Sequence, residues 1–260
     1  MALDGEQLDR FHADGYLPLG AVMSAAELET LSRRTDDLTG GRVPPGRVGF
    51  QLDKKWHHAG YDSTGYDYAG PSDGYRKIGG LEWDPIFYPV ITGPAMLDVI
   101  HQLVPQPLAI HRAMILMKPA HGGTALGWHQ DTGTGFPVPG TPYFTIWTAL
   151  DDAGADNGAM YILPGSQHFD ADGLPWQEVT ARARSRATAQ ENDGEKVVLT
   201  AAAGESYLLN PRVLHGSDPN PTDRRRRAMN VIYMPAGAAI TEDPDGRKQQ
   251  ERRRIEPAVA

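Results

Sequence analysis

The 260-residue sequence contains no cysteine. This absence excludes disulfide bonds, cysteine zinc sites, iron–sulfur clusters, thiolate haem ligands and a cysteine nucleophile. A metal ion bound by this chain must therefore be held by histidine, aspartate, glutamate or backbone oxygens. The nine histidines supply enough imidazoles for such a site.

Basic residues and long apolar runs are also scarce. The 25 Lys and Arg are outnumbered by 33 Asp and Glu, which gives a formal net charge of −8, whereas nucleic-acid-binding proteins usually carry a basic face. No segment reaches the roughly 18 consecutive apolar residues of a membrane span, and the first residues show no feature of a secretory signal. We therefore expect a cytoplasmic protein that acts on a small molecule, without nucleic acid or membrane as a partner.

The first 40 residues carry helix signals. Leu8 and Phe11 have helical spacing, Gly15 can end that helix, and an extended segment follows from residue 16. Ser24 with Glu27 three residues later is a capping box, which predicts a second helix. Another amphipathic helix is expected over residues 94–104.

Short apolar runs separated by Pro, Gly, Asn and Asp predict strands in the rest of the chain. They cover residues 108–117, 143–150, 159–163, 196–200, 206–209 and 228–234. Because long helices do not alternate with them, a mainly β fold with flanking helices, a sandwich or jelly roll, is favoured over a parallel α/β sheet. We expect residues 1–240 to form one domain and the charged residues 241–260 to be poorly ordered.

Two histidines and an aspartate suggest a metal site. His129 and Asp131 are two positions apart, so in an extended chain their side chains point to the same side. His215 follows 84 positions later. Two imidazoles and one carboxylate form the facial triad of non-haem iron(II) oxygenases, which leaves coordination positions for a co-substrate and dioxygen. A His-x-Asp pair alone is common, so this motif needs its surroundings to carry weight.

A run of four arginines, residues 224–227, follows about ten residues after His215. One guanidinium pointing inward is a natural partner for a dicarboxylate, because it pairs with carboxylates in bidentate fashion and stays charged. Alternation along a strand puts Arg226 and Arg227 on opposite faces and does not choose between them.

Several further motifs resemble the phytanoyl-CoA dioxygenase-like family of iron(II)/2-oxoglutarate-dependent oxygenases. The similarity extends from Asp14 to about Pro235. Its markers are Met117-Lys-Pro, Trp128-His-Gln-Asp, Ile146-Trp-Thr-Ala-Leu, Asn157-Gly-Ala-Met, Leu163-Pro-Gly-Ser-Gln-His and His215-Gly-Ser with Arg226-Arg-Ala. The resemblance implies a double-stranded β-helix, which is a cupin-like jelly roll with external helices.

The resemblance also implies a role for individual residues. His129, Asp131 and His215 match the iron ligands and thus the catalytic centre. Arg226 matches the arginine that binds the distal carboxylate of 2-oxoglutarate, and Ser217 matches a hydroxyl beside it. Further positions that line the 2-oxoglutarate site correspond to Lys77, Met114 and Trp147. The implied cofactors are Fe(II), 2-oxoglutarate as co-substrate and dioxygen, with succinate and carbon dioxide released while the substrate is hydroxylated or oxidatively cyclised.

Residues 53–75 are rich in aromatic and acidic side chains and are expected to form a long loop that acts as a lid. We predict that Trp56, His57, Tyr66 and Tyr68 contact the substrate. Aromatic rings and carboxylates suit a sugar-like or aminocyclitol natural product, and the net charge would modestly attract a cation. The alternative is an acyl-CoA or an amino-acid-type substrate, because the family also contains such hydroxylases.

Two other classes use similar residues. A non-catalytic jelly-roll binding protein would not need the triad together with Arg226. A zinc hydrolase could use two His and a carboxylate, but it would not need the arginine, and the sequence offers no extra Glu nearby as a base.

Overall fold

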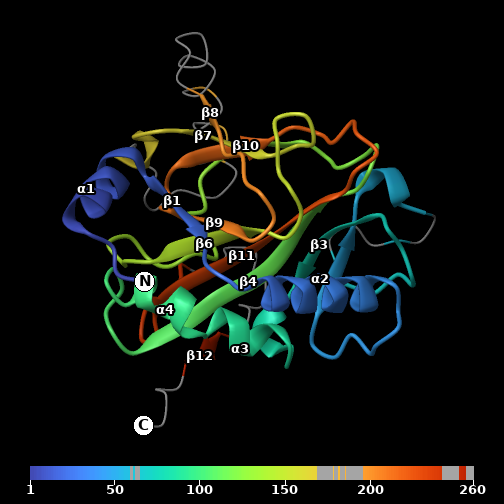
Figure 1. The fold of residues 1–260 in the computed structure, drawn as a ribbon, viewed down its shortest axis with the longest axis horizontal. Coiled ribbons are helices and arrows are strands. Elements are labelled where there is room, and N and C mark those ends of the chain that lie inside the picture. The colour runs from blue at the N-terminus through green and yellow to red at the C-terminus, as the bar shows by residue number, and fades with distance from the viewer. Residues whose placement is uncertain are drawn as a thin grey trace.

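The computed structural model describes residues 1–58, 61, 65–168, 178, 181, 185, 196–241 and 252–255. Two antiparallel sheets and a layer of helices make up these parts (Figure 1). The larger sheet has the strand order β1-β9-β6-β11-β4-β3-β2, with β12 beside β4, and the smaller has the order β5-β10-β7-β8. This is the double-stranded β-helix that the sequence predicted.

The strands predicted from the sequence correspond to β1, β4, β6, β7, β8, β9 and β11, whereas β2, β3, β5, β10 and β12 were not predicted. The larger sheet consists of β1 (Tyr16–Ala21), β2 (Gly49–Leu52), β3 (Tyr75–Gly79), β4 (Leu108–Lys118), β6 (Phe144–Ala149), β9 (Glu205–Leu209), β11 (Arg226–Pro235) and β12 (Arg253–Arg254). The smaller consists of β5 (Leu126–His129), β7 (Met160–Leu163), β8 (Val197–Val198) and β10 (Leu214–Ser217).

The helices begin and end where the sequence signals stand. In α1 (Gly5–Asp14) the Asp4 carboxylate accepts from the backbone N–H of Gln7, and Gly15 ends the helix with a φ of 79°. In α2 (Ala25–Thr39) the predicted capping box between Ser24 and Glu27 is present. The remaining helical elements are α3 (Phe87–Ile91), α4 (Pro94–Ile100) and the short 3-10 turns η1 (Lys54–Trp56), η2 (Leu81–Trp83) and η3 (Ser166–His168).

Alternation along β4 and β11 divides the interior into two parts. On one face, the buried side chains of Ile115, Val231 and Tyr233 pack with residues of α2, α3 and α4, which cover the outer side of the larger sheet (Figure 1). On the other face, side chains at alternate positions point toward the smaller sheet and line a cavity. The functional residues lie on this inner face.

Three predictions about local structure were wrong in part. The helix expected over residues 94–104 ends at Ile100. Residues 101–103 continue as turns, and Pro105 disfavours helical backbone in Val104. The segment 53–75, expected to be one long loop, contains η1 and reaches the start of β3 at Tyr75, so it is not a continuous loop. In the C-terminal tail, which was expected to be poorly ordered, Arg253 and Arg254 pair with β4.

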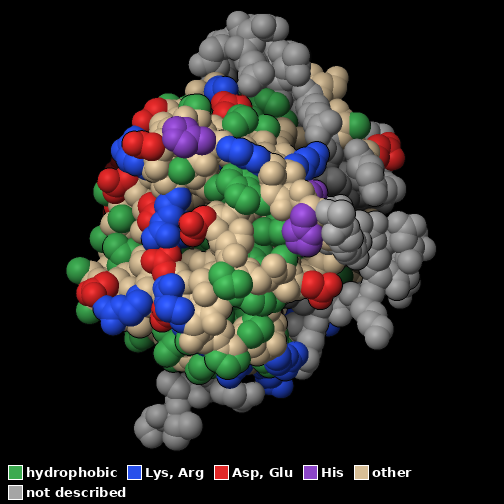
Figure 2. All heavy atoms as spheres, turned by 90° about the vertical axis from the view of Figure 1, so that its right-hand side faces the viewer, with side chains coloured by type: hydrophobic (Ala, Val, Ile, Leu, Met, Phe, Trp, Pro, Cys, Tyr) green, Lys and Arg blue, Asp and Glu red, His purple; other side chains and the backbone are tan. Residues whose placement is uncertain are grey.

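The surface of the described residues carries mixed charge. On the face shown in Figure 2, Lys and Arg side chains are interspersed with Asp and Glu. Exposed ion pairs among the described residues include Arg33–Glu29 and Arg224–Asp156. Exposed pairs of this kind contribute little to the free energy of folding. None of the helices in the described part of the chain is long and apolar enough to span a membrane.

Candidate metal and co-substrate site

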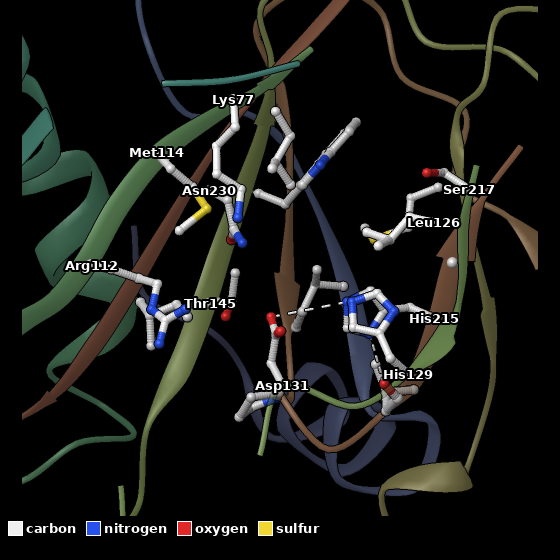
Figure 3. Close-up of a pocket in the computed structure, with 18 of the residues that line it drawn as sticks. Lys77, Arg112, Met114, Leu126, His129, Asp131, Thr145, His215, Ser217 and Asn230 are labelled. Atoms are coloured by element: carbon white, nitrogen blue, oxygen red, sulfur yellow. Dashed lines mark hydrogen bonds and ion pairs between the residues drawn. The ribbon is translucent and has the colours of Figure 1, made fainter. Parts of the chain in front are cut away.

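His129, Asp131 and His215 come together at the end of the smaller sheet (Figure 3). Strand pairing brings the two histidines together, because His215 of β10 lies opposite His129 of β5 in the antiparallel register. Asp131 follows two residues after the end of β5 and is held by a backbone hydrogen bond from its N–H to the carbonyl of Pro211 (2.7 Å). One candidate ligand atom from each residue lies within 4.8 Å of the others, an arrangement that can hold one metal ion.

Backbone carbonyls orient both imidazoles. Nδ1 of His129 lies 2.8 Å from the carbonyl oxygen of Gly127, and Nδ1 of His215 lies 2.9 Å from that of Val213. When Nδ1 carries the proton and donates it to the carbonyl, Nε2 has its lone pair free for a metal. Burial, together with the neighbouring His215, lowers the pKa of His129 to about 4, so its imidazole is neutral at physiological pH.

The triad opens into a cavity of about 340 Å³ between the two sheets. Its wall on the larger sheet carries cationic side chains, namely Arg76, Lys77, Arg112, Lys118 and Arg226. Asp131 is the only carboxylate among the described residues that line it. The interior therefore has the opposite charge balance to the molecule as a whole and suits anionic ligands.

Arg226 lies at one end of this cavity and is almost fully buried, with 3% of its surface exposed. Its Nη2 donates to the carbonyl oxygen of Gly158 (2.6 Å), whereas its Nε has no hydrogen-bond partner among the described residues. Burial lowers its pKa to about 10, so it remains charged at neutral pH. A buried guanidinium with a free donor is what a carboxylate of 2-oxoglutarate requires.

Lys118 lies beside Arg226, since the two residues are paired between β4 and β11. Its Nζ donates to the carbonyl oxygen of Thr124 (2.6 Å) and holds the segment that leads into β5. Burial and the adjacent Arg226 lower the pKa of Lys118 to about 7. An anion bound at this end of the cavity would stabilise both cations.

The residues predicted for the co-substrate all line the same cavity as the triad. Lys77, Met114 and Trp147 stand on three strands of the larger sheet, and Ser217 stands on the smaller sheet. Arg227 faces the other way and pairs with Asp151 and Asp36. Strand alternation alone did not show which of Arg226 and Arg227 faces the cavity. In the structure it is Arg226.

The residues predicted for the substrate are not among those that line this cavity. The ring of Trp56 packs against Gly74 and Gly122, and it borders a second cavity of about 290 Å³. Tyr68 packs against the core rings of Phe50 and Tyr75.

The other two predicted substrate contacts, His57 and Tyr66, are exposed, although the Tyr66 hydroxyl accepts a hydrogen bond from Nζ of Lys77 (3.3 Å). Within the predicted lid, residues 59, 60 and 62–64 lie outside the described residues. Lid closure therefore stays a prediction.

The sequence prediction missed several polar residues of the cavity wall, among them Arg112, Thr145 and Asn230. A signal for Arg112 was present, because it stands two positions before Met114 in one strand and so shares its face. The same signal was present for Thr145, two positions before Trp147 in β6, and for Asn230, four positions after Arg226 in β11.

Comparison with known proteins agrees with this geometry. The chain is 27% identical over 271 residues to phytanoyl-CoA dioxygenase domain-containing protein 1 from Bos taurus, covering 92% of each chain. It is 24% identical over 249 residues to L-proline trans-4-hydroxylase from Streptomyces griseoviridis, covering 86% of this chain and 84% of the relative. A crystal structure of EctD from S. alaskensis with bound Fe has the same fold, with a TM-score of 0.75, 18% identity and coverage of 98% and 87%.

Fold and site together define a jelly-roll oxygenase with a His-Asp-His centre. Residues 11–228 match the family described as Phytanoyl-CoA dioxygenase (PhyH), and the chain belongs to this family. The protein is therefore an iron(II)/2-oxoglutarate-dependent dioxygenase, as the sequence predicted.

Proposed function

We propose that His129, Asp131 and His215 hold iron(II) and that Arg226 binds the distal carboxylate of 2-oxoglutarate in the same cavity. The enzyme would use them to hydroxylate or oxidatively cyclise a small polar metabolite, with release of succinate and carbon dioxide. The free Nε of buried Arg226, in one cavity with the triad, carries this proposal. Iron(II) with 2-oxoglutarate and dioxygen supplies the oxidising power, and the chain supplies binding, orientation and protection from water.

The side chains divide these tasks. The two imidazoles, oriented by backbone carbonyls, and the Asp131 carboxylate offer three ligands and leave the remaining positions for other groups. Arg226 fixes one end of the co-substrate, with Ser217 and Lys118 at the same end of the cavity. Met114 and Trp147 provide an apolar surface between the two ends, which limits access of water.

The charge of the cavity bears on the substrate class. A sugar-like or aminocyclitol substrate was inferred from the aromatic residues at 53–75, but Trp56 and Tyr68 serve packing. An aminocyclitol is a cation and would meet five cationic side chains against one carboxylate. An amino-acid-type substrate is the second candidate, supported by the likeness to L-proline trans-4-hydroxylase.

An anaerobic titration tests the co-substrate part of this proposal. Adding iron(II) and 2-oxoglutarate to the protein should give the weak visible charge-transfer band of the chelate, and His129→Ala or His215→Ala should abolish it. A mixture that stays colourless, with no measurable affinity for 2-oxoglutarate, would contradict the proposal. Turnover with a panel of small acids, sugars and amines, scored by succinate release and product mass, then tests the substrate class.

A further inference from the structure

The inner wall of the larger sheet is a grid of rows, set by the strand register. One row contains Arg112, Ile232 and Thr145, and the next contains Met114, Asn230 and Trp147. The row of Leu116, Ala228 and Ala149 follows, and the last row contains Lys118 and Arg226. The grid thus has cations at both ends. Between them lie apolar residues, the amide of Asn230, and Lys77 of β3, which pairs with Leu116 in the third row.

Three unpartnered polar atoms gather in the first two rows. Nε of Arg112, Oγ1 of Thr145 and Oδ1 of Asn230 are buried and have no hydrogen-bond partner among the described residues. Thr145 is 2% exposed and Asn230 is 8% exposed. Leaving such atoms unpaired costs about 1–3 kcal/mol each, so a group that binds to them gains affinity. All three side chains line the same cavity as the triad (Figure 3).

2-Oxoglutarate bound to Arg226 does not reach Arg112 in the first row. The Cα atoms of the first and last rows are six residues apart along β4, which is about 20 Å at roughly 3.3–3.4 Å per residue. The terminal carbons of a five-carbon chain are no more than about 6 Å apart. Each guanidinium is also held at its own end, Arg226 by the carbonyl of Gly158 and Arg112 by that of Gly135. Arg112 is therefore available to a second ligand.

The local fold directs Arg112 into the cavity and leaves it without a close counter-charge. A bulge in β4 at His111, between the pairs Ile232–Arg112 and Tyr233–Ile110, places both His111 and Arg112 on the inner side. The guanidinium stacks on Phe136 at 4.4 Å and bonds to Nε2 of His111 (2.9 Å). No carboxylate among the described residues lies within ion-pair distance of it. The negative charge that acts on it most strongly is that of Asp131, which a bound metal would neutralise.

We propose that Arg112, with Thr145 and Asn230, binds the carboxylate of the primary substrate, which is a small organic acid with an additional hydroxyl or amino group. The guanidinium pairs with the carboxylate. The Thr145 hydroxyl and the Asn230 amide can each donate or accept and therefore suit the additional polar group. This inference rests on the proposed function, because it places the substrate beside the metal triad.

Binding of three ring compounds that differ in one group tests the site. Cyclohexanecarboxylate, cyclohexanecarboxamide and cyclohexylammonium are titrated calorimetrically, without oxygen, into protein saturated with iron(II) and 2-oxoglutarate. The carboxylate should bind at least ten-fold more tightly than the amide, and the ammonium should bind weakest. In Arg112→Gln the carboxylate and the amide should bind within two-fold of each other, whereas Arg112→Lys should keep part of the preference.

Arg225→Gln is the matched control, because this arginine is half-exposed, pairs with Asp36 and lies outside the cavity. It should behave as the wild type. Equal binding of the three compounds, preference for the ammonium, no binding of the carboxylate, or an unchanged preference in Arg112→Gln would each overturn the inference. The visible band of the iron–2-oxoglutarate chelate is recorded on each sample and distinguishes the two proposals. If the wild type shows no band, the proposed function is contradicted. If the band is present but the carboxylate is not preferred, only the Arg112 site is contradicted.

Discussion

Arg226 and Arg227 are neighbours in sequence with opposite tasks. Arg226 faces the cavity with a free Nε, so Arg226→Ala should weaken binding of 2-oxoglutarate while iron binding changes little. Leaving one partner of a buried charge pair alone costs about 3–5 kcal/mol, which is a loss of at least 100-fold in affinity. Calorimetric titration of 2-oxoglutarate measures this loss of affinity. Arg224→Ala is the control, because Arg224 belongs to an exposed ion pair and its removal should leave 2-oxoglutarate affinity nearly unchanged.

Arg227→Ala should act on stability instead. Its guanidinium is 4% exposed and pairs with Asp151 (2.8 Å) and Asp36 (2.9 Å) on the outer side of β11. Since both carboxylates are partly exposed, we expect a loss of about 2–4 kcal/mol in the free energy of unfolding, somewhat less than for a fully buried pair. Urea unfolding measures it. A stable Arg227→Ala protein that has lost 2-oxoglutarate binding would mean that the register of β11 is shifted by one residue.

Glu82 makes stability depend on pH. The residue is fully buried, its Oε2 accepts from the backbone N–H of Ala113 (3.0 Å), and its Oε1 has no partner among the described residues. Burial raises its pKa to about 7 from an ordinary value of 4.5. A carboxyl group whose pKa is raised in the folded state gives stability that is complete below pH 4.5 and is lost as the pH rises through 7.

The change Glu82→Gln should therefore flatten the pH dependence of unfolding between pH 5 and 8. A shift of this size corresponds to about 3 kcal/mol, and the variant should be more stable than the wild type by that order at pH 8. Its amide oxygen can still accept from Ala113. Parallel pH profiles for the two proteins would contradict this account.

At the scale of elements, β10 is held tightly against both of its neighbours. A Cβ atom added at Gly216 would lie 2.6 Å from the Tyr161 ring of β7 and 2.8 Å from the carbonyl oxygen of Leu126 in β5. Gly216→Ala should therefore displace β10 and with it His215, lowering iron affinity by about 10–100-fold. Gly237→Ala is the control, because nothing lies within 4 Å of its added Cβ. Unchanged iron affinity in Gly216→Ala would show that β10 is not held in this way.

The C-terminal strand β12 is a second element with a measurable contribution. The Arg253 guanidinium stacks on Tyr88 at 3.3 Å and donates to the carbonyl of Glu82, and Ile255 is 8% exposed. We expect Ile255→Ala to lower the free energy of unfolding by about 2 kcal/mol and Arg253→Ala to lower it by about 1–2 kcal/mol, as measured by thermal unfolding. Arg254→Ala, at an exposed position of the same strand, should change little. Equal stability of all three variants would indicate that β12 does not dock in solution.

At the scale of the whole molecule, local patterns predicted more of the fold than of the substrate site. A capping box and helical spacing predicted α1 and α2, and short apolar runs predicted seven of the described strands. The triad of His129, Asp131 and His215 was expected from its spacing together with the family motifs around it. The rows of the inner wall depend on pairing between distant segments, such as Ile232 with both Arg112 and Thr145, which local patterns do not encode. The aromatic composition of residues 53–75 also did not distinguish side chains that pack in the core from side chains that bind a substrate, since Tyr68 packs against Phe50 in the core.

The two sheets carry separate parts of the chemistry. His129 and His215 stand on the smaller sheet, with Asp131 just beyond its strand β5, while Arg226, Arg112, Thr145 and Asn230 stand on the larger one. On our proposals, an exchange in the first row of the larger sheet would change which molecule is accepted without touching a metal ligand. The architecture therefore allows new substrate preferences to arise by one or two substitutions at positions 112 and 145, on a scaffold whose oxidising centre is kept. It is a suitable starting point for directed evolution toward other acids.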